Sequence, residues 1–201
     1  MKIILVFFAL FLCLGATGQH YIIKQVNSDH VAQFEKALEA TLTERNGNIT
    51  TILSPSLYPM VAQKNLGQPY YYERKRSYFR VPAISEYFFD ESGDVLWYTS
   101  TSWRATNGVS VFDFDAMEKK LKDEISHKKE YILFYNEISQ QISKGYGRPT
   151  EKTNVLEHIG KNSVGERKTW ETDTMKIVLQ IRMPKENTIE SLRVTLTTYW
   201  K

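Results

Sequence analysis

The chain has 201 residues, of which 42% are hydrophobic and 24% are charged, with 26 basic residues against 23 acidic ones. A formal net charge of +3 does not indicate the strongly basic face that is typical of nucleic-acid-binding proteins, so we expect no nucleic acid partner. The single cysteine, Cys13, lies near the N-terminus. The remainder of the chain is therefore expected to be stable through its core alone, without disulfides.

The first 18 residues have the pattern of a secretory signal peptide. Lys2 precedes an unbroken apolar run over residues 3–14, and Ala16 and Gly18 supply the small residues before a cleavage site. The apolar run is too short for a ~30 Å hydrocarbon core, which takes about 20 residues. We therefore expect residues 1–18 to be removed. The product is then a periplasmic or extracellular chain that begins at Gln19 and has no membrane span.

Two stretches have the apolar spacing of amphipathic helices. In the first, Val31, Phe34, Leu38 and Leu42 fall on one face of a 3.6-residue period, and Asn46-Gly47 is the expected stop. This pattern predicts a helix across residues 31–42.

The second helical stretch repeats these offsets at Phe114, Met117, Leu121 and Ile125. Its stripe continues over residues 131–142, Asp115 and Glu118 have capping-box spacing, and Gly145 is the expected C-terminal stop. Residues 126–129 contain no Gly or Pro, so the sequence leaves open whether one helix or two cover residues 115–144.

Runs of β-branched and aromatic residues predict strands after each helical stretch. A turn at residues 90–94 joins two of the runs as a hairpin. The expected strands lie at residues 70–81, 83–89, 95–103, 167–171, 175–181 and 192–200.

Both halves of the chain share one order of landmarks: a helical stripe, a Gly-x-Pro, a hairpin, and a Thr/Ser-rich strand that ends at Trp103 or Trp200. This order fits a tandem repeat with halves 19–108 and 109–201, or a chance recurrence of common turn residues. In element order alone, the layout is similar to that of secreted inhibitor-type proteins with two helix-plus-antiparallel-sheet units, such as the β-lactamase inhibitory protein. The resemblance includes no shared motif and implies no residue roles.

The residues give little support for a metal or nucleotide cofactor. The four histidines, His20, His30, His127 and His158, lack metal-ligand spacing. Residues 160–165 have the glycine spacing of a phosphate loop, but Glu166-Arg167 stands where Lys and a hydroxyl residue are required. We therefore expect no cofactor.

Carboxylates gather at residues 90–94, where Asp90 and Asp94 would be the pair for a calcium loop or a carboxylate-dependent hydrolase. The alternative is a hairpin turn, since Asp and Gly favour turn conformations. We favour the turn and place the hydrolase last among the functions considered.

The candidate binding surface is the strand over residues 70–81, whose alternation puts tyrosines and arginines on one face. Flat amphipathic rings beside bidentate donors suit an anionic glycan, a peptide or a protein partner. The alternative is an edge strand with no ligand. The candidate residues are Tyr70, Tyr72, Arg74, Arg76, Tyr78 and Arg80.

Together these patterns predict a single compact α+β domain over residues 19–201, with antiparallel strands and two or three amphipathic helices packed on one face of the sheet. The expected function is that of an exported, non-enzymatic binding or accessory protein. A secreted inhibitor or a structural envelope protein is the alternative.

Overall fold

A computed structural model describes residues 21–43, 66, 68–75, 81–106, 109–110, 112–154, 163–184 and 191–201. The predicted signal peptide lies outside the described residues. So does the expected helix stop at Asn46-Gly47.

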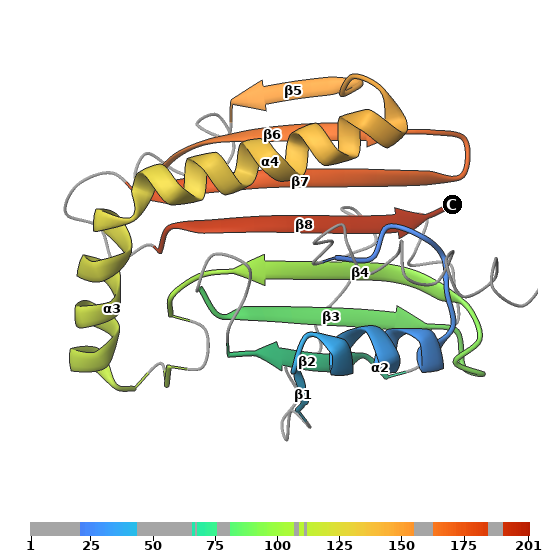
Figure 1. Cartoon of the computed structure of the whole chain (residues 1–201), viewed down its shortest axis with the longest axis horizontal. Coiled ribbons are helices and arrows are strands. Elements are labelled where there is room, and N and C mark those ends of the chain that lie inside the picture. The colour runs from blue at the N-terminus through green and yellow to red at the C-terminus, as the bar shows by residue number, and fades with distance from the viewer. Residues whose placement is uncertain are drawn as a thin grey trace, which may run out of the picture.

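The described residues form an α+β fold in which helices pack on one antiparallel sheet (Figure 1). The helices are α2 (Ser28–Ala37), α3 (Phe114–Ser126) and α4 (Lys128–Tyr146). The strands are β1 (Thr41–Leu42), β2 (Tyr70–Arg74), β3 (Ala83–Phe89), β4 (Leu96–Trp103), β5 (Glu151–Asn154), β6 (Ser163–Glu171), β7 (Met175–Pro184) and β8 (Arg193–Trp200). The predicted fold class is confirmed.

The sheet is formed from two meanders that meet in its middle. The strand order is β1-β2-β3-β4-β8-β7-β6-β5, and β4 pairs with β8 antiparallel, with Ser100 opposite Thr197. Outward from this central pair, the strands on each side follow one another in reverse chain order, from β4 to β1 and from β8 to β5. Among the described residues the helices differ, because one helix precedes the first meander and two precede the second. A tandem repeat stays a prediction.

One face of the sheet carries the core. In Figure 1, α4 lies across β6 and β7, and α2 lies across β2 and β3, on the same side. Under α4, Ile138 and Ile142 pack with Trp103, Trp170 and alternate residues of β7 and β8. A second cluster joins Val31 of α2 to residues of β2, β3, β4 and β8. The helices cover one face, as expected for amphipathic helices on a sheet.

The first helix is shorter than its apolar pattern predicted. It ends at Ala37, because Glu39 adopts a positive φ of 54° and the chain turns into β1. Leu42 consequently lies in a strand and is 52% exposed. The Asn27 side chain caps the helix by accepting a hydrogen bond from the His30 backbone N–H.

The second helical stretch consists of two helices that meet at His127. The N-terminal cap is Asp113, whose carboxylate accepts a hydrogen bond from the Ala116 backbone N–H at 3.0 Å, so the predicted capping box at Asp115 is wrong. The helical stretch ends at Gly147, with φ 79°, rather than at Gly145. A positive φ favours glycine at this position.

The apolar stripe of α3 does not face the core. Glu124 is the one buried residue of this helix among the described residues, and Phe114 and Ile125 are 75% and 55% exposed. By contrast, six residues of α4 are buried. Both stripes have a spacing that fits one face of a helix, but only the second one lies over the sheet.

Candidate binding surface

The structure places the predicted tyrosine and arginine residues of β2 against α2. Tyr70, Tyr72 and Arg74 share one face of the strand, as predicted, but this face is the one that the helices cover. Tyr72 and Arg74 are 8% and 2% exposed, whereas Tyr70 is 41% exposed. Arg76, Tyr78 and Arg80 lie outside the described residues. Within β2, therefore, Arg74 is part of the interior.

Arg74 is held by a carboxylate on the neighbouring helix. Its Nε donates to Glu35 Oε2 at 2.7 Å, and its Nη2 and the Tyr87 hydroxyl both donate to Glu35 Oε1. Burial acts to lower the pKa of Arg74, but the hydrogen bond and charge of Glu35 outweigh it and raise that pKa. Burial and the same carboxylate raise the pKa of Tyr87 well above 10. This network fastens α2 to the sheet.

The opposite face of the sheet carries no described helix, and we call it the helix-free face. A hollow of about 400 Å³ lies on it and extends over β4, β8, β7, β6 and β5. Strands lie about 4.8 Å apart, so five strands make the hollow roughly 20 Å wide. Its lining residues are Tyr98, Ser100, Ser102, Glu151, Arg167, Thr169, Lys176, Val178, Gln180, Arg193, Thr195, Thr197 and Tyr199.

Three arginines gather toward one end of this hollow. Arg182 lies directly opposite Arg193 across the β7–β8 pair, and Arg167 lies opposite Gln180 one row further along the face. Like charges in directly opposite cross-strand positions repel one another. An anion bound between such side chains would offset that repulsion. The register therefore gathers three arginines at this end of the face.

Arg167 has unused hydrogen-bonding capacity. Its Nε is buried and has no hydrogen-bond partner in the part of the chain that the structure describes. A guanidinium presents its donors in a fixed fork that matches a carboxylate or a sulfate. The hydroxyls of Ser102 and Thr195 lie on adjoining positions of β4 and β8. These groups provide a set of donors that suits an anion.

The other end of the hollow is aromatic, and its charges are paired. Tyr98 packs edge-on against Phe88, with ring centroids 5.4 Å apart, and is 3% exposed. Lys176 lies 6.0 Å from the Tyr199 ring centroid and 3.4 Å from the Glu171 carboxylate. Since the Tyr98 ring is almost fully buried, it offers no platform on which a sugar could stack. Polar and charged contacts are the recognition that this face can provide.

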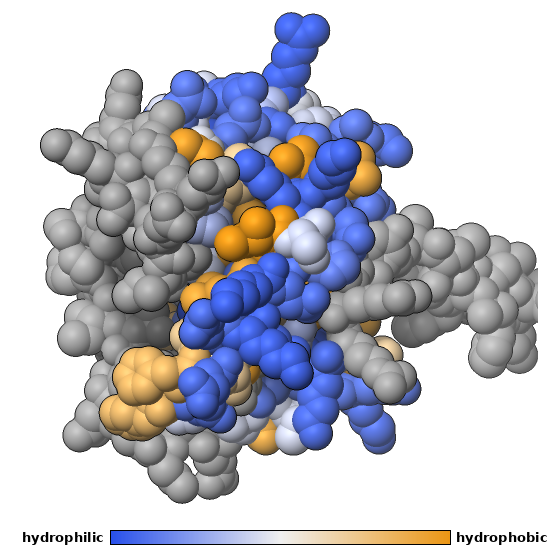
Figure 2. Space-filling view, turned by 90° about the vertical axis from the view of Figure 1, so that its left-hand side faces the viewer, coloured by the Kyte–Doolittle hydropathy of each residue, from blue (hydrophilic) through white to orange (hydrophobic). Residues whose placement is uncertain are grey.

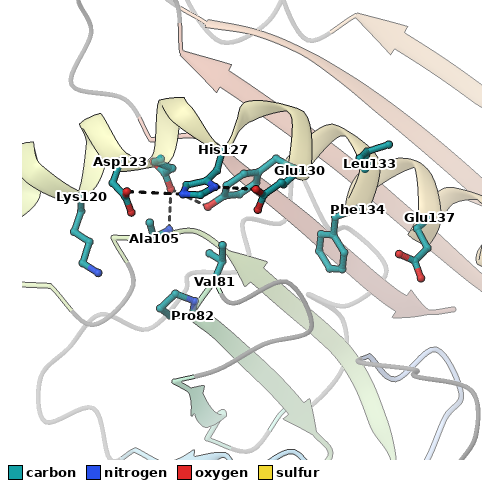
Figure 3. Close-up of a pocket in the computed structure, with 12 residues that line it drawn as sticks. Val81, Pro82, Ala105, Lys120, Asp123, His127, Glu130, Leu133, Phe134 and Glu137 are labelled. Atoms are coloured by element: carbon teal, nitrogen blue, oxygen red, sulfur yellow. Dashed lines mark hydrogen bonds and ion pairs between the residues drawn. The ribbon is translucent and has the colours of Figure 1, made fainter.

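A second cleft, of about 610 Å³, lies where α3 and α4 meet the start of β3 and the residue Ala105 (Figure 3). His127 lies between two carboxylates there. Its Nδ1 is 3.0 Å from Glu130 Oε1, and its Nε2 is 3.8 Å from Asp123 Oδ1. Hydrogen bonding to Glu130 raises the pKa of His127. Both ring nitrogens face carboxylates, so neither is placed to take a proton from a substrate.

Glu124 in the same cleft is a structural group. Its Oε1 accepts hydrogen bonds from the Ala105 backbone N–H at 2.7 Å and the Tyr131 hydroxyl at 3.1 Å, and its Oε2 accepts from the Leu192 N–H at 3.0 Å. Burial raises the pKa of Glu124, although these bonds act to lower it. The carboxylate thus joins α3 to the segments beside β4 and β8, and the cleft is a joint between elements.

The remaining sequence candidates have local roles. Asp90 Oδ1 accepts hydrogen bonds from the backbone N–H groups of Asp94 and Val95, at 2.9 and 3.2 Å, so this carboxylate stabilises the predicted hairpin turn. Glu166, which follows the glycine pattern at 160–165, pairs with Lys152 and Lys168. Across the described residues, no cluster of three or more His, Cys, Asp or Glu side chains could hold a metal ion.

Sequence reasoning missed the helix-free face. Period-2 alternation at residues 175–181 and 192–200 predicted which residues of β7 and β8 line the core. The complementary positions include Lys176, Gln180, Arg193 and Thr195. The sequence therefore already showed polar side chains, two of them cationic, at the alternate positions of these two strands. Their meaning depended on knowing that β7 and β8 are neighbours in a register that puts Arg182 opposite Arg193.

Comparisons with known proteins identify no relative. No protein-family model matches the chain, and no significant match was found among curated proteins or solved structures. Among the described residues, no helix is both long enough and apolar enough to cross a membrane. The function must therefore be argued from the surfaces themselves.

Proposed function

We propose that this chain is an exported, non-enzymatic binding protein, and that its helix-free face holds an acidic segment of a protein partner. The observation that carries the proposal is the set of arginines on that face, with Arg182 opposite Arg193 and Arg167 on the adjoining row. The proposal keeps the arginine-based recognition that the sequence suggested, without the tyrosines. It moves that recognition from β2 to β6, β7 and β8.

Charge complementarity favours an acidic partner. The hollow is lined by Arg167 and Arg193, by Lys176, which pairs with Glu171, and by one carboxylate, Glu151. Hydroxyl donors from β4 and β8 lie between them. Aspartate and glutamate side chains on a protruding loop of the partner would meet arginine guanidinium groups at one end of the hollow and hydroxyl groups in its middle. A width of roughly 20 Å suits a folded partner rather than a single small molecule.

A protein partner is favoured over a sulfated or carboxylated glycan because the aromatic rings on this face are almost fully buried. Tyr98 and Tyr199 are 3% and 7% exposed. Sugar recognition by aromatic side chains requires an exposed ring face. The anionic glycan is therefore an alternative outcome of the test below.

Export is the second part of the proposal and depends on the sequence of residues 1–18, with Lys2, the apolar run and the small residues before Gln19. An exported chain would meet its partner in the periplasm or outside the cell. An inhibitor of an extracellular enzyme is one kind of protein that would bind in this way.

The test is affinity capture from envelope and culture-medium extracts with the purified exported chain. The test variant carries Arg182→Glu and Arg193→Glu. The control variant carries Lys128→Glu and Lys129→Glu on the exposed first turn of α4, and has the same net charge. We expect the parent chain and the control variant to capture a protein that the test variant does not capture.

Two results would contradict the proposal. Equal capture by both variants would mean that the helix-free face does not bind the partner. If the parent chain captures no protein but binds a sulfated polysaccharide, the ligand is a glycan instead. Circular dichroism of each variant establishes that a loss of capture does not come from unfolding.

A further inference from the structure

Arg167 of β6 has uncharged neighbours on the helix-free face. The residues directly opposite it are Thr153 on β5 and Gln180 on β7. Along β6, the residues two positions away on the same face are Gly165 and Thr169. None of these four residues can form an ion pair with the guanidinium. The charge of Arg167 is therefore not neutralised by the residues nearest to it in register.

The adjacent cation of β6 is paired, on the other face of the sheet. Lys168 donates to Ser139 Oγ at 3.0 Å and lies 3.2 Å from Glu166 Oε1. By contrast, the Arg167 Nε is buried without an acceptor among the described residues. In that part of the chain, no other residue that lines the hollow has a buried side-chain donor without a partner. Arg167 is thus the lining residue whose hydrogen bonds are incomplete.

One carboxylate lies close to this arginine in register. Glu151 pairs with Thr169, so it occupies the position diagonal to Arg167 across the β5–β6 pair. Diagonal neighbours in an antiparallel sheet are about 7–8 Å apart, which is within reach of long side chains. Glu151 is exposed and lines the same hollow as Arg167. A ligand that binds Arg167 therefore meets the negative charge of Glu151 as well.

We infer that Arg167 is the main contact for a carboxylate of the partner, and that Glu151 sets how tightly this carboxylate is held. The inference rests on the proposed function and names the residues that decide its specificity. A guanidinium presents a fork of donors that matches the two oxygens of a carboxylate. Arg182 and Arg193 each have a further interaction within the chain. The incomplete hydrogen bonding of Arg167 distinguishes it from them.

A row of polar side chains continues from Arg167 across the sheet. Gln180, directly opposite Arg167, lies opposite Thr195 on β8, and Thr195 lies opposite Ser102 on β4. All four residues line the hollow. With strands about 4.8 Å apart, the row spans roughly 14 Å, the length of about four residues of extended chain. A peptide along this row has its carboxylate on Arg167 and its peptide groups beside amide and hydroxyl groups.

The end of the molecule nearest the arginines is mainly polar. In Figure 1, β8 begins at the end of the sheet where α3 lies, and Arg193 is the first residue of β8. Figure 2 looks onto that end, and the described residues visible there are mainly hydrophilic. An acidic segment that approaches from this end crosses polar surface on its way to the hollow, and nearby cations accelerate the association of acidic ligands.

The first experiment uses an acetylated, amidated tetraglutamate peptide as the probe, with NMR detection of arginine Nε–Hε signals of the purified exported chain. We expect the Arg167 signal to show the largest shift, and to saturate. Arg167→Lys keeps the charge but removes the fork, so it should weaken binding roughly tenfold, as expected for the loss of a charged hydrogen bond. Arg148→Lys, at an exposed side chain just beyond α4, is the matched control and should bind as the wild type does.

Three results would overturn the inference: absence of peptide binding, equal binding by Arg167→Lys and the wild type, or a shift confined to the signals of Arg182 and Arg193. The third result would leave the proposed function standing, because the same face would still hold the acidic segment. The proposed function fails separately, when reversal of the charges of Arg182 and Arg193 leaves protein capture unchanged.

The second experiment tests the role of Glu151. Glu151→Gln removes a negative charge about 7–8 Å from Arg167 and should tighten peptide binding about two- to threefold, an effect that shrinks as salt is added. Glu91→Gln makes the same charge change at an exposed position in the β3–β4 turn and should have no such effect. Equal effects of the two changes would overturn the role of Glu151. Sodium sulfate that shifts the Arg167 signal at lower concentration than the peptide would overturn the assignment to a carboxylate.

Discussion

Glu35 of α2 and Arg74 of β2 form a buried ion pair, in which the Arg74 Nε donates to Glu35 Oε2 at 2.7 Å and the two side chains are 0% and 1% exposed. The Tyr87 hydroxyl donates to the same carboxylate. Buried charges are stable only when they are paired and hydrogen-bonded, so this contact fixes the position of α2 on the sheet.

Removal of one partner from this pair should be costly. Arg74→Met leaves the Glu35 carboxylate buried without its cation, and we expect it to lower the free energy of unfolding by about 3–5 kcal/mol. The triple replacement Glu35→Leu, Arg74→Met, Tyr87→Phe removes the polar groups together and should cost much less. Urea unfolding of the single and triple variants measures this difference. A triple variant that loses as much stability as Arg74→Met alone would contradict this expectation.

Glu124 should give the protein a pH dependence opposite in sign to that of most carboxylates. Burial raises its folded-state pKa above 4.5, so the folded chain binds its proton more tightly than the unfolded chain does. The stabilising contribution of this protonation is fully present below the unfolded pKa and is lost as pH rises through the folded pKa.

The measurement for Glu124 is the free energy of unfolding between about pH 4 and pH 8, for the wild-type chain and Glu124→Gln. The wild-type value minus the variant value should fall as pH rises. All other titrating groups are shared, so they cancel in this difference. A difference that grew with rising pH would mean that the hydrogen bonds from Ala105, Leu192 and Tyr131 outweigh burial.

Trp103 and Trp200 predict that the two halves of the sheet unfold together. Trp103 of β4 packs on Phe134 of α4, with ring centroids 5.1 Å apart, and Trp200 of β8 packs in the cluster that contains Val31 of α2. Each tryptophan therefore belongs to the core beneath the helix of the other half. Trp103→Ala should cost about 3–5 kcal/mol.

Calorimetry tests this coupling. The van't Hoff and calorimetric enthalpies should agree in a single transition, and Trp103→Ala should shift that whole transition to lower temperature. Leu133→Ala, at a side chain that is 68% exposed, is the control and should change stability by no more than about 0.5 kcal/mol. Two separate transitions would instead indicate two independent domains.

Much of the fold could be predicted because its patterns are local. The stripe over residues 131–142 and the alternation over 175–181 predicted which sides of α4 and β7 are buried, since each depends only on residue spacing. The same reasoning was wrong for α3, because an apolar stripe indicates a helix without indicating what covers it. Leu121 and Ile138 occupy equivalent stripe positions and differ only in what the tertiary fold places beside them.

The candidate surface could not be predicted in the same way. Arg74 looked like an exposed binding residue because its partner, Glu35, lies 39 residues away in the sequence. Arg182 and Arg193 become neighbours only through the β7–β8 register. Long-range pairing decides which arginines are buried and which are gathered on a surface, and residue spacing alone does not contain that information.

Photo-cross-linking in cells that produce the full chain is the most direct test of the central claim, that the helix-free face binds an acidic protein partner. A photoreactive phenylalanine analogue replaces Thr195, in the hollow, or Leu133, exposed on α4. We predict a covalent adduct with another protein from position 195, which disappears with Arg182→Glu and Arg193→Glu, and none from position 133. An adduct from position 133 alone, or one at 195 that survives both charge reversals, would contradict the account.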